Sequence, residues 1–207
     1  MIVLDGRTSA RVLRDELRDR IARYFLGSEP AQVRPGLATI LVGDDPASAV
    51  YVRTKKKACE DVGIASFGYA FPSDVRAAKV RSLIVELNVR KDVHGILLQL
   101  PLPAHLDTPS LIEAIDPAKD VDGLHPVNQG RLVLGQAGLR PCTPLAVMHL
   151  INNSSARLEG KRAVVVGRSN LVGKPLALLL LERNATVTTC HSHTDDLAEQ
   201  IAQADIV

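Results

Sequence analysis

The stretch KRAVVVGRSNLVGKPLALLLLERNATVTTCHS (161–192) combines an apolar run, a glycine turn, an apolar helical pattern and a second β-type run. A short apolar run that ends in glycine before a helical pattern is typical of a strand buried on both faces. Strands separated by helices pair in parallel through right-handed crossovers. This stretch therefore predicts an α/β protein with a parallel sheet.

The same alternation of strand and helix signals runs through the preceding residues. Strands are predicted at 36–43, 66–72 and 94–103, the last broken by its prolines, and helices at 8–24, 46–63 and 75–88. Residues 104–140 are rich in turn signals, and a helix is predicted to begin at 143–144. We expect an N-terminal α/β catalytic domain over 1–142 and a Rossmann-like parallel-sheet domain over 143–207.

The glycine turn between the strand and the helix of this second domain suggests a phosphate site. Gly167 ends the strand and Gly173 lies just inside the helix. Such a turn lets backbone N–H groups at a helix N-terminus approach a phosphate of a dinucleotide. The spacing is not G-x-G-x-x-G, so a tight β–α connection without a ligand stays open as an alternative.

The residues around this turn favour NADP over NAD. NAD sites usually place an acid at the end of the second strand, but residues 189–193 (TCHSH) contain no carboxylate. Arg168 lies in the turn, where a guanidinium can meet a 2′-phosphate through two hydrogen bonds. The alternative is that Arg168 is a solvated turn residue.

A second feature lies in SAVYVRTKKKACEDVGI (48–64), where Tyr51 and Lys55 stand four residues apart. Positions i and i+4 share one helix face, so the phenol and the amine can belong to one site. Short-chain dehydrogenases also use a Tyr-x-x-x-Lys pair, but their glycine turn precedes the pair. Here the pair comes first, which argues against that class.

Composition excludes several classes of protein. The 207 residues carry a formal charge of +2 and 3% aromatic residues, which does not suggest a nucleic-acid surface. No apolar run reaches the ~18 residues of a membrane span, and the N-terminal residues do not resemble a signal peptide. Cys59, Cys142 and Cys190 are far apart, which predicts free thiols in a reducing compartment and no metal site. We expect a cytoplasmic protein.

Five motifs, in order, give this chain a family resemblance. They are VGDDPASAVYVRTKKKACEDVGI (42–64), HGILLQLPLP (94–103), PAKDVDGLHPVNQGRL (117–132), RPCTP (140–144) and VVVGRSNLVGKPLALLL (164–180). Residues 38–205 thereby resemble the bifunctional methylenetetrahydrofolate dehydrogenase/methenyltetrahydrofolate cyclohydrolase family. The resemblance implies two domains, NADP as cofactor, tetrahydrofolate derivatives as substrates and a homodimer.

The resemblance also implies roles for individual residues. Lys55 matches the catalytic lysine, Tyr51 the tyrosine that stacks on folate, and Gln99 the polarising glutamine. Asp122 matches the aspartate that binds the pterin, and we expect Gln99 to reach Lys55 by a hydrogen bond. Without the family, Lys55 would be read as a surface lysine and Asp122 as a turn former. The remaining implied contacts are Leu100 and Pro101 for folate, and Gly167, Arg168, Ser169, Val172, Gly173, His191 and Ser192 for NADP.

The resemblance implies NADP-dependent oxidation of 5,10-methylenetetrahydrofolate, followed by hydrolysis of the methenyl product to 10-formyltetrahydrofolate. The chain ends at ADIV (204–207), where the family continues, so we expect a C-terminally truncated enzyme. One alternative is an inactive fragment that binds folate or pairs with a complete subunit. Another is a different two-domain dehydrogenase, such as a shikimate-type or amino-acid enzyme, which the motif around Asp122 disfavours.

Overall fold

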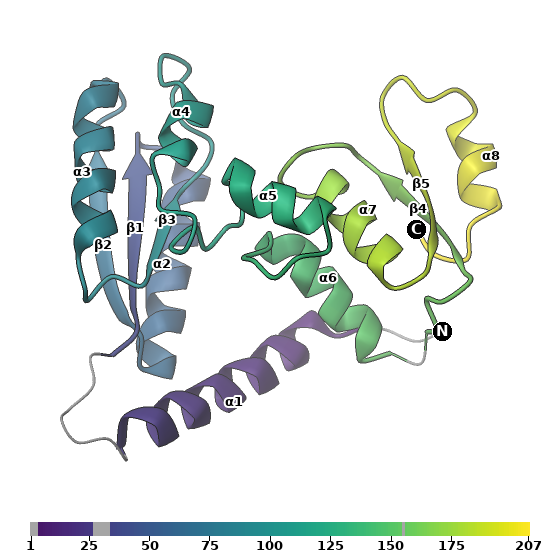
Figure 1. The fold of residues 1–207 in the computed structure, drawn as a ribbon, viewed down its shortest axis with the longest axis horizontal. Coiled ribbons are helices and arrows are strands. Elements are labelled where there is room, and N and C mark those ends of the chain that lie inside the picture. Colours follow the sequence, from purple (N-terminus) through teal and green to yellow (C-terminus); the bar gives the residue numbers. More distant parts are fainter. Residues whose placement is uncertain (1–3, 27–33, 155) are drawn as a thin grey trace. The chain divides into compact units, whose positions relative to one another are not determined.

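The computed structural model describes residues 4–26, 34–154 and 156–207, and it has the α/β architecture that the sequence predicts (Figure 1). The residue contacts divide the chain into two compact units, Gly6–Val121 and one that holds Asp122–Val207. The first unit contains α1 (Gly6–Leu26), β1 (Gly36–Val42), α2 (Pro46–Val62), β2 (Ala65–Phe71), α3 (Ala77–Val89), β3 (Gly95–Leu98) and α4 (Thr108–Glu113). The second contains α5 (Pro126–Val133), α6 (Cys142–Asn152), β4 (Arg162–Val166), α7 (Gly173–Glu182), β5 (Thr186–Cys190) and α8 (Leu197–Ala202).

The first unit is built on a parallel sheet with the strand order β2-β1-β3. Gly36 pairs with Ala65 on one side of β1, and Leu37 pairs with Gly95 on the other. The central strand β1 is buried along most of its length, as expected of a strand covered on both faces. The parallel pairing confirms the prediction made from the alternation of strands and helices.

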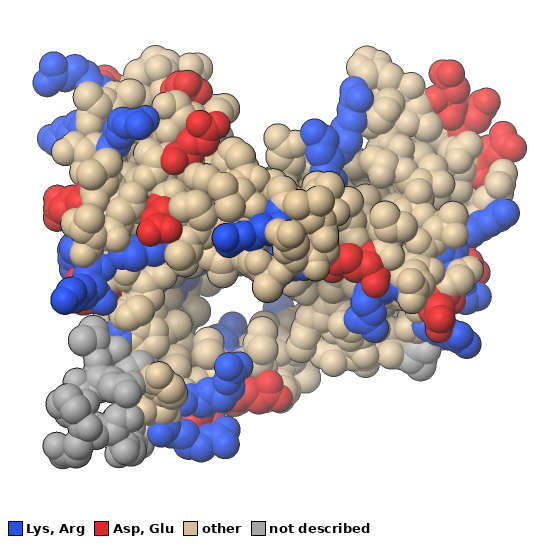
Figure 2. All heavy atoms as spheres, in the orientation of Figure 1, with Lys and Arg blue, Asp and Glu red and all other residues tan. Residues whose placement is uncertain are grey.

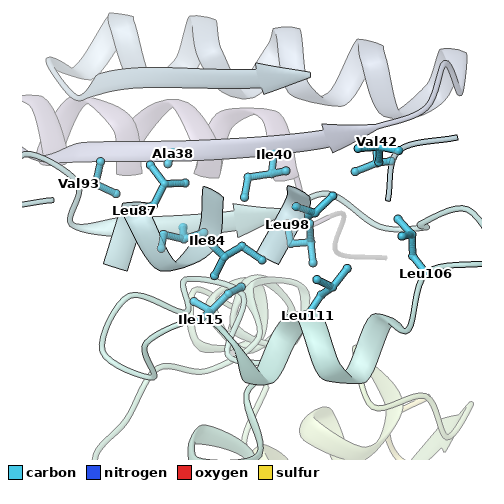
Figure 3. Packing of buried hydrophobic residues seen from close by; sticks show 13 residues of the cluster. Ala38, Ile40, Val42, Ile84, Leu87, Val93, Leu98, Leu106, Leu111 and Ile115 are labelled. Carbon is cyan, nitrogen blue, oxygen red and sulfur yellow. The ribbon is translucent and has the colours of Figure 1, made fainter. Parts of the chain in front are cut away.

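The core of this unit lies between the sheet and the helices α3 and α4. Ile84 and Leu87 of α3, together with Leu111 and Ile115, lie close to the side chains of β1 and β3 (Figure 3). Ile84 and Leu87 are fully buried. Burial of such side chains stabilises the unit by about 1.5–3 kcal/mol each. The packed sheet thus positions the residues that follow the ends of its strands.

Strand β3 ends at Leu98, before the prolines at 101 and 103 that are expected to break it, because proline cannot donate to a ladder. One region differs from the expectations. The turn-rich region 104–140 contains the short helices α4 and α5. Each begins with a capping side chain and a proline in its first turn, a combination that resembles a turn in sequence.

The second unit contains the β–α–β segment that the sequence predicts within residues 161–192. β4 and β5 pair in parallel, with Val166 opposite Cys190, and Ile206 pairs with Ala163. α7 packs on β5 and on α6, around the buried Leu179 and Leu180. We expected a domain boundary at 142, whereas residues 122–142 cluster with this second unit.

The surface carries charges of both signs. On the face drawn in Figure 2, basic and acidic side chains are interspersed over each unit. Among the residues that the structure describes, no helix is long and apolar enough to cross a membrane. Within the same residues, no group of three or more His, Cys, Asp and Glu side chains is arranged to hold a metal ion.

Candidate active site

Helix α2 carries Tyr51 and Lys55, and both of its ends are fixed. The Asp45 carboxylate accepts a hydrogen bond from the Ser48 N–H (2.7 Å), and Pro46 occupies the first helical position. Hydrogen bonds from Ser48, first from its hydroxyl and then from its N–H, lower the pKa of Asp45. At the other end Gly63 adopts a left-handed conformation (φ 86°), the usual glycine stop signal. The helix is therefore a defined support for the side chains on its inner face.

The structure brings Lys55 and Gln99 together across 44 residues of sequence. Lys55 Nζ donates a hydrogen bond to Gln99 Oε1 at 3.1 Å. This contact confirms the hydrogen bond that we expected from the sequence. Lys55 is half-buried, whereas its neighbours Lys56 and Lys57 are exposed. Only the first of the three lysines is thus directed to the end of the sheet.

Gln99 is held by hydrogen bonds of its own, so it fixes the lysine amine in turn. Its N–H donates to Ile40 O (2.9 Å), which continues the pairing of β3 with β1. Its side-chain Nε2 donates to Leu100 O (2.8 Å), which leaves Oε1 to face the amine. The Leu100–Pro101 peptide bond is cis. A neutral amide thus orients the lysine without neutralising its charge.

The other lysines on this helix lie elsewhere, as the helical geometry predicts. Residues next to each other on a helix diverge by about 100°. Lys56 forms an ion pair with Glu60 at 3.9 Å, and both side chains are about 60% exposed. Such an exposed pair contributes little to stability.

Of the remaining predicted folate residues, Tyr51 lies on α2, whereas Leu100, Pro101 and Asp122 follow β3 in the sequence. Tyr51 is 59% exposed, one turn before Lys55, so its ring is available to a ligand. Leu100 is half-buried and Pro101 is exposed, directly after Gln99. Asp122 is half-buried and is the first residue of the second unit after Val121. The structure thus joins Lys55 and Gln99 by a direct contact, and their roles stay predictions.

In the second unit the glycine turn is shaped by backbone contacts. Gly167 follows β4 with φ 138°, a conformation that favours glycine, and a side chain there would meet open space. A side chain on Gly173 would collide with the carbonyl of Gly167. Ser169 Oγ accepts hydrogen bonds from the N–H groups of Val172 (3.1 Å) and Gly173 (3.4 Å). Strand and helix therefore approach as closely as in dinucleotide-binding turns, with free space beside Gly167.

The loop after β5 lies at the same edge as this turn. Gly167 N donates to Cys190 O (2.8 Å), so Arg168 and His191 follow neighbouring strand ends. His191 N donates to Thr194 Oγ1 (2.8 Å), and His191 Nδ1 accepts from His193 N (3.2 Å). Arg168, Ser169 and Ser192 are exposed. Sequence reasoning missed Thr194, whose only signal is a hydroxyl three residues after His191.

A cavity of about 350 Å³ adjoins the glycine turn within the second unit. Four predicted cofactor residues contribute to its wall, together with apolar side chains of α6, β4 and α7. These four are Gly167, Ser169, Val172 and Gly173. Ile206 and Val207 complete the wall, so these four predicted residues share one concave surface.

The fold and these contacts define a two-unit α/β protein with a dinucleotide-type β–α–β unit. Two family models match the chain. The model of the tetrahydrofolate dehydrogenase/cyclohydrolase catalytic domain matches residues 4–122. The model of the NAD(P)-binding domain of the same family matches residues 141–207. The chain belongs to the tetrahydrofolate dehydrogenase/cyclohydrolase family, as its motifs indicate.

Individual relatives agree with this assignment. The bifunctional protein FolD of Magnetococcus marinus is 53% identical over 99% of this chain and 71% of its own length. The crystal structure of the FolD methylenetetrahydrofolate dehydrogenase/cyclohydrolase from Campylobacter jejuni matches with a TM-score of 0.95 at 43% identity. That match covers 100% of this chain and 73% of the other. The Trypanosoma brucei enzyme, complexed with NADP and an inhibitor, matches with a TM-score of 0.92 at 37% identity, over 100% of this chain and 70% of the other.

Proposed function

We propose that this protein oxidises 5,10-methylenetetrahydrofolate with NADP and hydrolyses the resulting 5,10-methenyltetrahydrofolate to 10-formyltetrahydrofolate. Family membership supports the pair of reactions. The observation that carries the proposal in the chain itself is the Lys55 Nζ–Gln99 Oε1 hydrogen bond of 3.1 Å. It orients an amine one helical turn after an exposed aromatic ring, Tyr51, at the end of the buried strand β3.

In the dehydrogenase step, a hydride leaves the methylene carbon and the adjacent nitrogen lone pair stabilises the cation that forms. Bound NADP supplies the hydride acceptor. The residues of this chain then have only to position the two reactants. Tyr51 offers a flat apolar face to the aminobenzoyl ring, and Asp122 accepts hydrogen bonds from the pterin N–H groups. Leu100 and Pro101 complete the folate contacts in this proposal.

The cyclohydrolase step requires proton transfers. A water oxygen bonds to the methenyl carbon and loses a proton, and one C–N bond opens as its nitrogen takes up a proton. We assign both transfers to Lys55 Nζ. Gln99 holds this amine in place through its own hydrogen bonds to Ile40 and Leu100. General acid–base catalysis of this kind contributes typically 10²–10⁴-fold in rate.

The NADP site in this proposal is the glycine turn and the loop after β5. The turn residues Gly167, Ser169, Val172 and Gly173 form the part that receives phosphate groups. Arg168, with His191 and Ser192, is available for the 2′-phosphate, and no carboxylate occurs between Thr189 and His193. A guanidinium binds a phosphate through two parallel hydrogen bonds, so the site favours NADP.

We also propose that two copies of the chain associate. Within the described residues, β2 pairs only with β1 and so forms one edge of its sheet. Such edges are ready to pair with a further strand. Gly68 lies on this strand, and a side chain there meets nothing within 4 Å. Gly68→Lys should therefore halve the mass in sedimentation without unfolding the chain, and an unchanged dimer would place the contact elsewhere.

The three free cysteines agree with a cytoplasmic location.

The direct test of the proposed function uses the protein expressed from its complete reading frame. Added 5,10-methylenetetrahydrofolate and NADP should give 5,10-methenyltetrahydrofolate, followed by 10-formyltetrahydrofolate. Added methenyl substrate should open without NADP. Absence of both conversions in a folded protein that binds folate would overturn the proposal.

A further inference from the structure

Lys119 is a half-buried lysine within the motif PAKDVDGLHPVNQGRL (117–132), and the proposed reactions give it no role. Its ammonium donates hydrogen bonds to Leu87 O (3.0 Å) and Arg90 O (2.8 Å) at the C-terminal end of α3. The last carbonyls of a helix have no partner within the helix, and a positive charge is favourable there. Helix α3 has no basic residue of its own in its last turn. Lys119 therefore caps a helix from a distant segment.

The main chain of the same residue is attached to the sheet. Ile96 N donates to Lys119 O (2.7 Å), and Asp120 forms a parallel bridge with Ile96. A side chain at Gly95 would collide with Val121, so the segment lies directly against β3. Lys119 thus ties residues 119–121 both to α3 and to the strand that leads to Gln99.

The consequence concerns the residue that the chain reaches next. Residues 119–121 lead without interruption into Asp122, the proposed pterin ligand, while β3 leads into Gln99. A segment that is held at both its side chain and its main chain leaves its next residues little freedom. We propose that Lys119 is a positioning residue for folate binding, which acts by fixing the chain immediately before Asp122. This inference rests on the proposed function.

A second attachment of the same loop provides a matched control. Asn88 Nδ2 donates to Ala114 O (2.8 Å), and Asn88 Oδ1 accepts from Asp116 N (2.9 Å). Asn88 therefore also joins α3 to this loop through two hydrogen bonds. Its contacts end at Asp116, further from Asp122 along the chain than those of Lys119. Loss of either residue should lower the free energy of unfolding, but only the loss of Lys119 should weaken folate binding.

The experiment measures steady-state dehydrogenase kinetics and thermal unfolding of the protein expressed from its complete reading frame. Lys119→Met should raise the KM for 5,10-methylenetetrahydrofolate about tenfold or more, which is the change that corresponds to the loss of one charged hydrogen bond. The KM for NADP should stay unchanged. Lys119→Gln, which keeps one donor group, should give a smaller rise and covers the case in which Lys119→Met does not fold. Lys119→Arg, which keeps the charge and the donors, should restore a KM near the wild-type value.

The controls separate a specific effect on folate binding from a general loss of stability. Asn88→Ala should lower the melting temperature and leave the KM for folate unchanged. If both Asn88→Ala and the Lys119 variants raise that KM equally, or if neither does, Lys119 is only a helix cap and the inference is wrong. Asp122→Asn serves as the reference for the proposed function. If it raises the KM while Lys119→Met and Lys119→Gln do not, the inference alone fails; if it leaves the KM unchanged, the assignment of Asp122 fails as well.

Discussion

The two candidate sites of this chain depend on different features, side-chain groups at one and backbone shape at the other. The site on α2 and β3 depends on functional groups, an amine and an amide in contact at 3.1 Å. The turn between β4 and α7 depends on the absence of side chains, because Gly173 packs against the Gly167 carbonyl. A substitution at the first site removes chemistry and leaves the backbone in place. A substitution at the second changes the shape of the backbone itself.

The largest effect should follow from the loss of the amine at the first site. Lys55→Met keeps most of the apolar stem, and we expect it to lower the cyclohydrolase rate by about 10²–10⁴-fold. Dehydrogenase activity should stay measurable, because hydride transfer needs neither an acid nor a base. The disappearance and formation of 5,10-methenyltetrahydrofolate report the two rates.

Lys56→Met is the matched control for this variant. Its ammonium lies on the surface, 3.9 Å from the Glu60 carboxylate, so both activities should stay close to wild type. If Lys55→Met still opens the ring at the wild-type rate, the lysine is structural and the proposed proton transfers are wrong.

At the second site the strongest change is a methyl group on the helix start. Gly173→Ala places a Cβ against backbone atoms of Gly167 that cannot move aside. We expect a loss of about 1–3 kcal/mol in the free energy of unfolding, the usual range for overpacking, and weaker NADP binding. Denaturant unfolding and NADP titration measure the two effects.

Gly130→Ala is the control for this prediction. Gly130 lies in α5, and a side chain there meets nothing within 4 Å. Alanine should therefore be neutral or stabilise the helix by up to about 1 kcal/mol. Equal stability and NADP affinity for Gly173→Ala and wild type would show that the close approach of the turn is not required.

Arg168 is the charged side chain that we assign to the second site, so its removal sharpens the comparison. Arg168→Ala should weaken NADP binding by about 1.5–3 kcal/mol, as for a lost charged hydrogen bond, and leave NAD binding unchanged. Lys174→Ala removes an exposed cation at the start of α7, whose Nζ donates a hydrogen bond to Asn170 Oδ1, and should leave the selectivity unchanged. Equal weakening of NAD and NADP by Arg168→Ala would mean that another residue recognises the 2′-phosphate.

The smallest expected effect concerns the helix that carries Lys55. Asp45 caps α2 with its carboxylate, and its pKa is lowered in the folded protein by hydrogen bonds from Ser48. A group whose pKa is lowered on folding stabilises the protein above its unfolded value, near 4, and loses this contribution as the pH falls further. Asp45→Ala should therefore lower the melting temperature at pH 7. The difference from wild type should shrink below about pH 4, and a difference that grows at low pH would contradict the assignment.

The same contrast explains what the sequence could reveal. The β4–α7 turn is contiguous, so the apolar run and the two glycines predict it directly. Tyr51 and Lys55 are four residues apart, and helical geometry places them on one side. The contact between Lys55 and Gln99 spans 44 residues, and it was expected because a family resemblance named both residues. Local periodicity alone could not have predicted this contact.

Other features escaped the sequence because their signals are ambiguous. Helices α4 and α5 begin with a capping residue and a proline, which also mark turns. Lys119 has no signal of its own in the local sequence pattern, and only the absence of a basic residue at the end of α3 hints at its role. The extent of the domains differs as well, since residues 122–142 cluster with the second unit.

The central claim is that one site supplies proton chemistry and the other supplies cofactor binding. It is tested most directly by the rate at which added 5,10-methenyltetrahydrofolate disappears in the absence of NADP, measured for Lys55→Met and Gly173→Ala. Ring opening needs no hydride acceptor, so we predict that Gly173→Ala retains most of this rate while Lys55→Met loses at least a hundredfold, the lower end of the acid–base range. Retention of the rate in Lys55→Met, or its equal loss in a folded Gly173→Ala protein, would contradict the account.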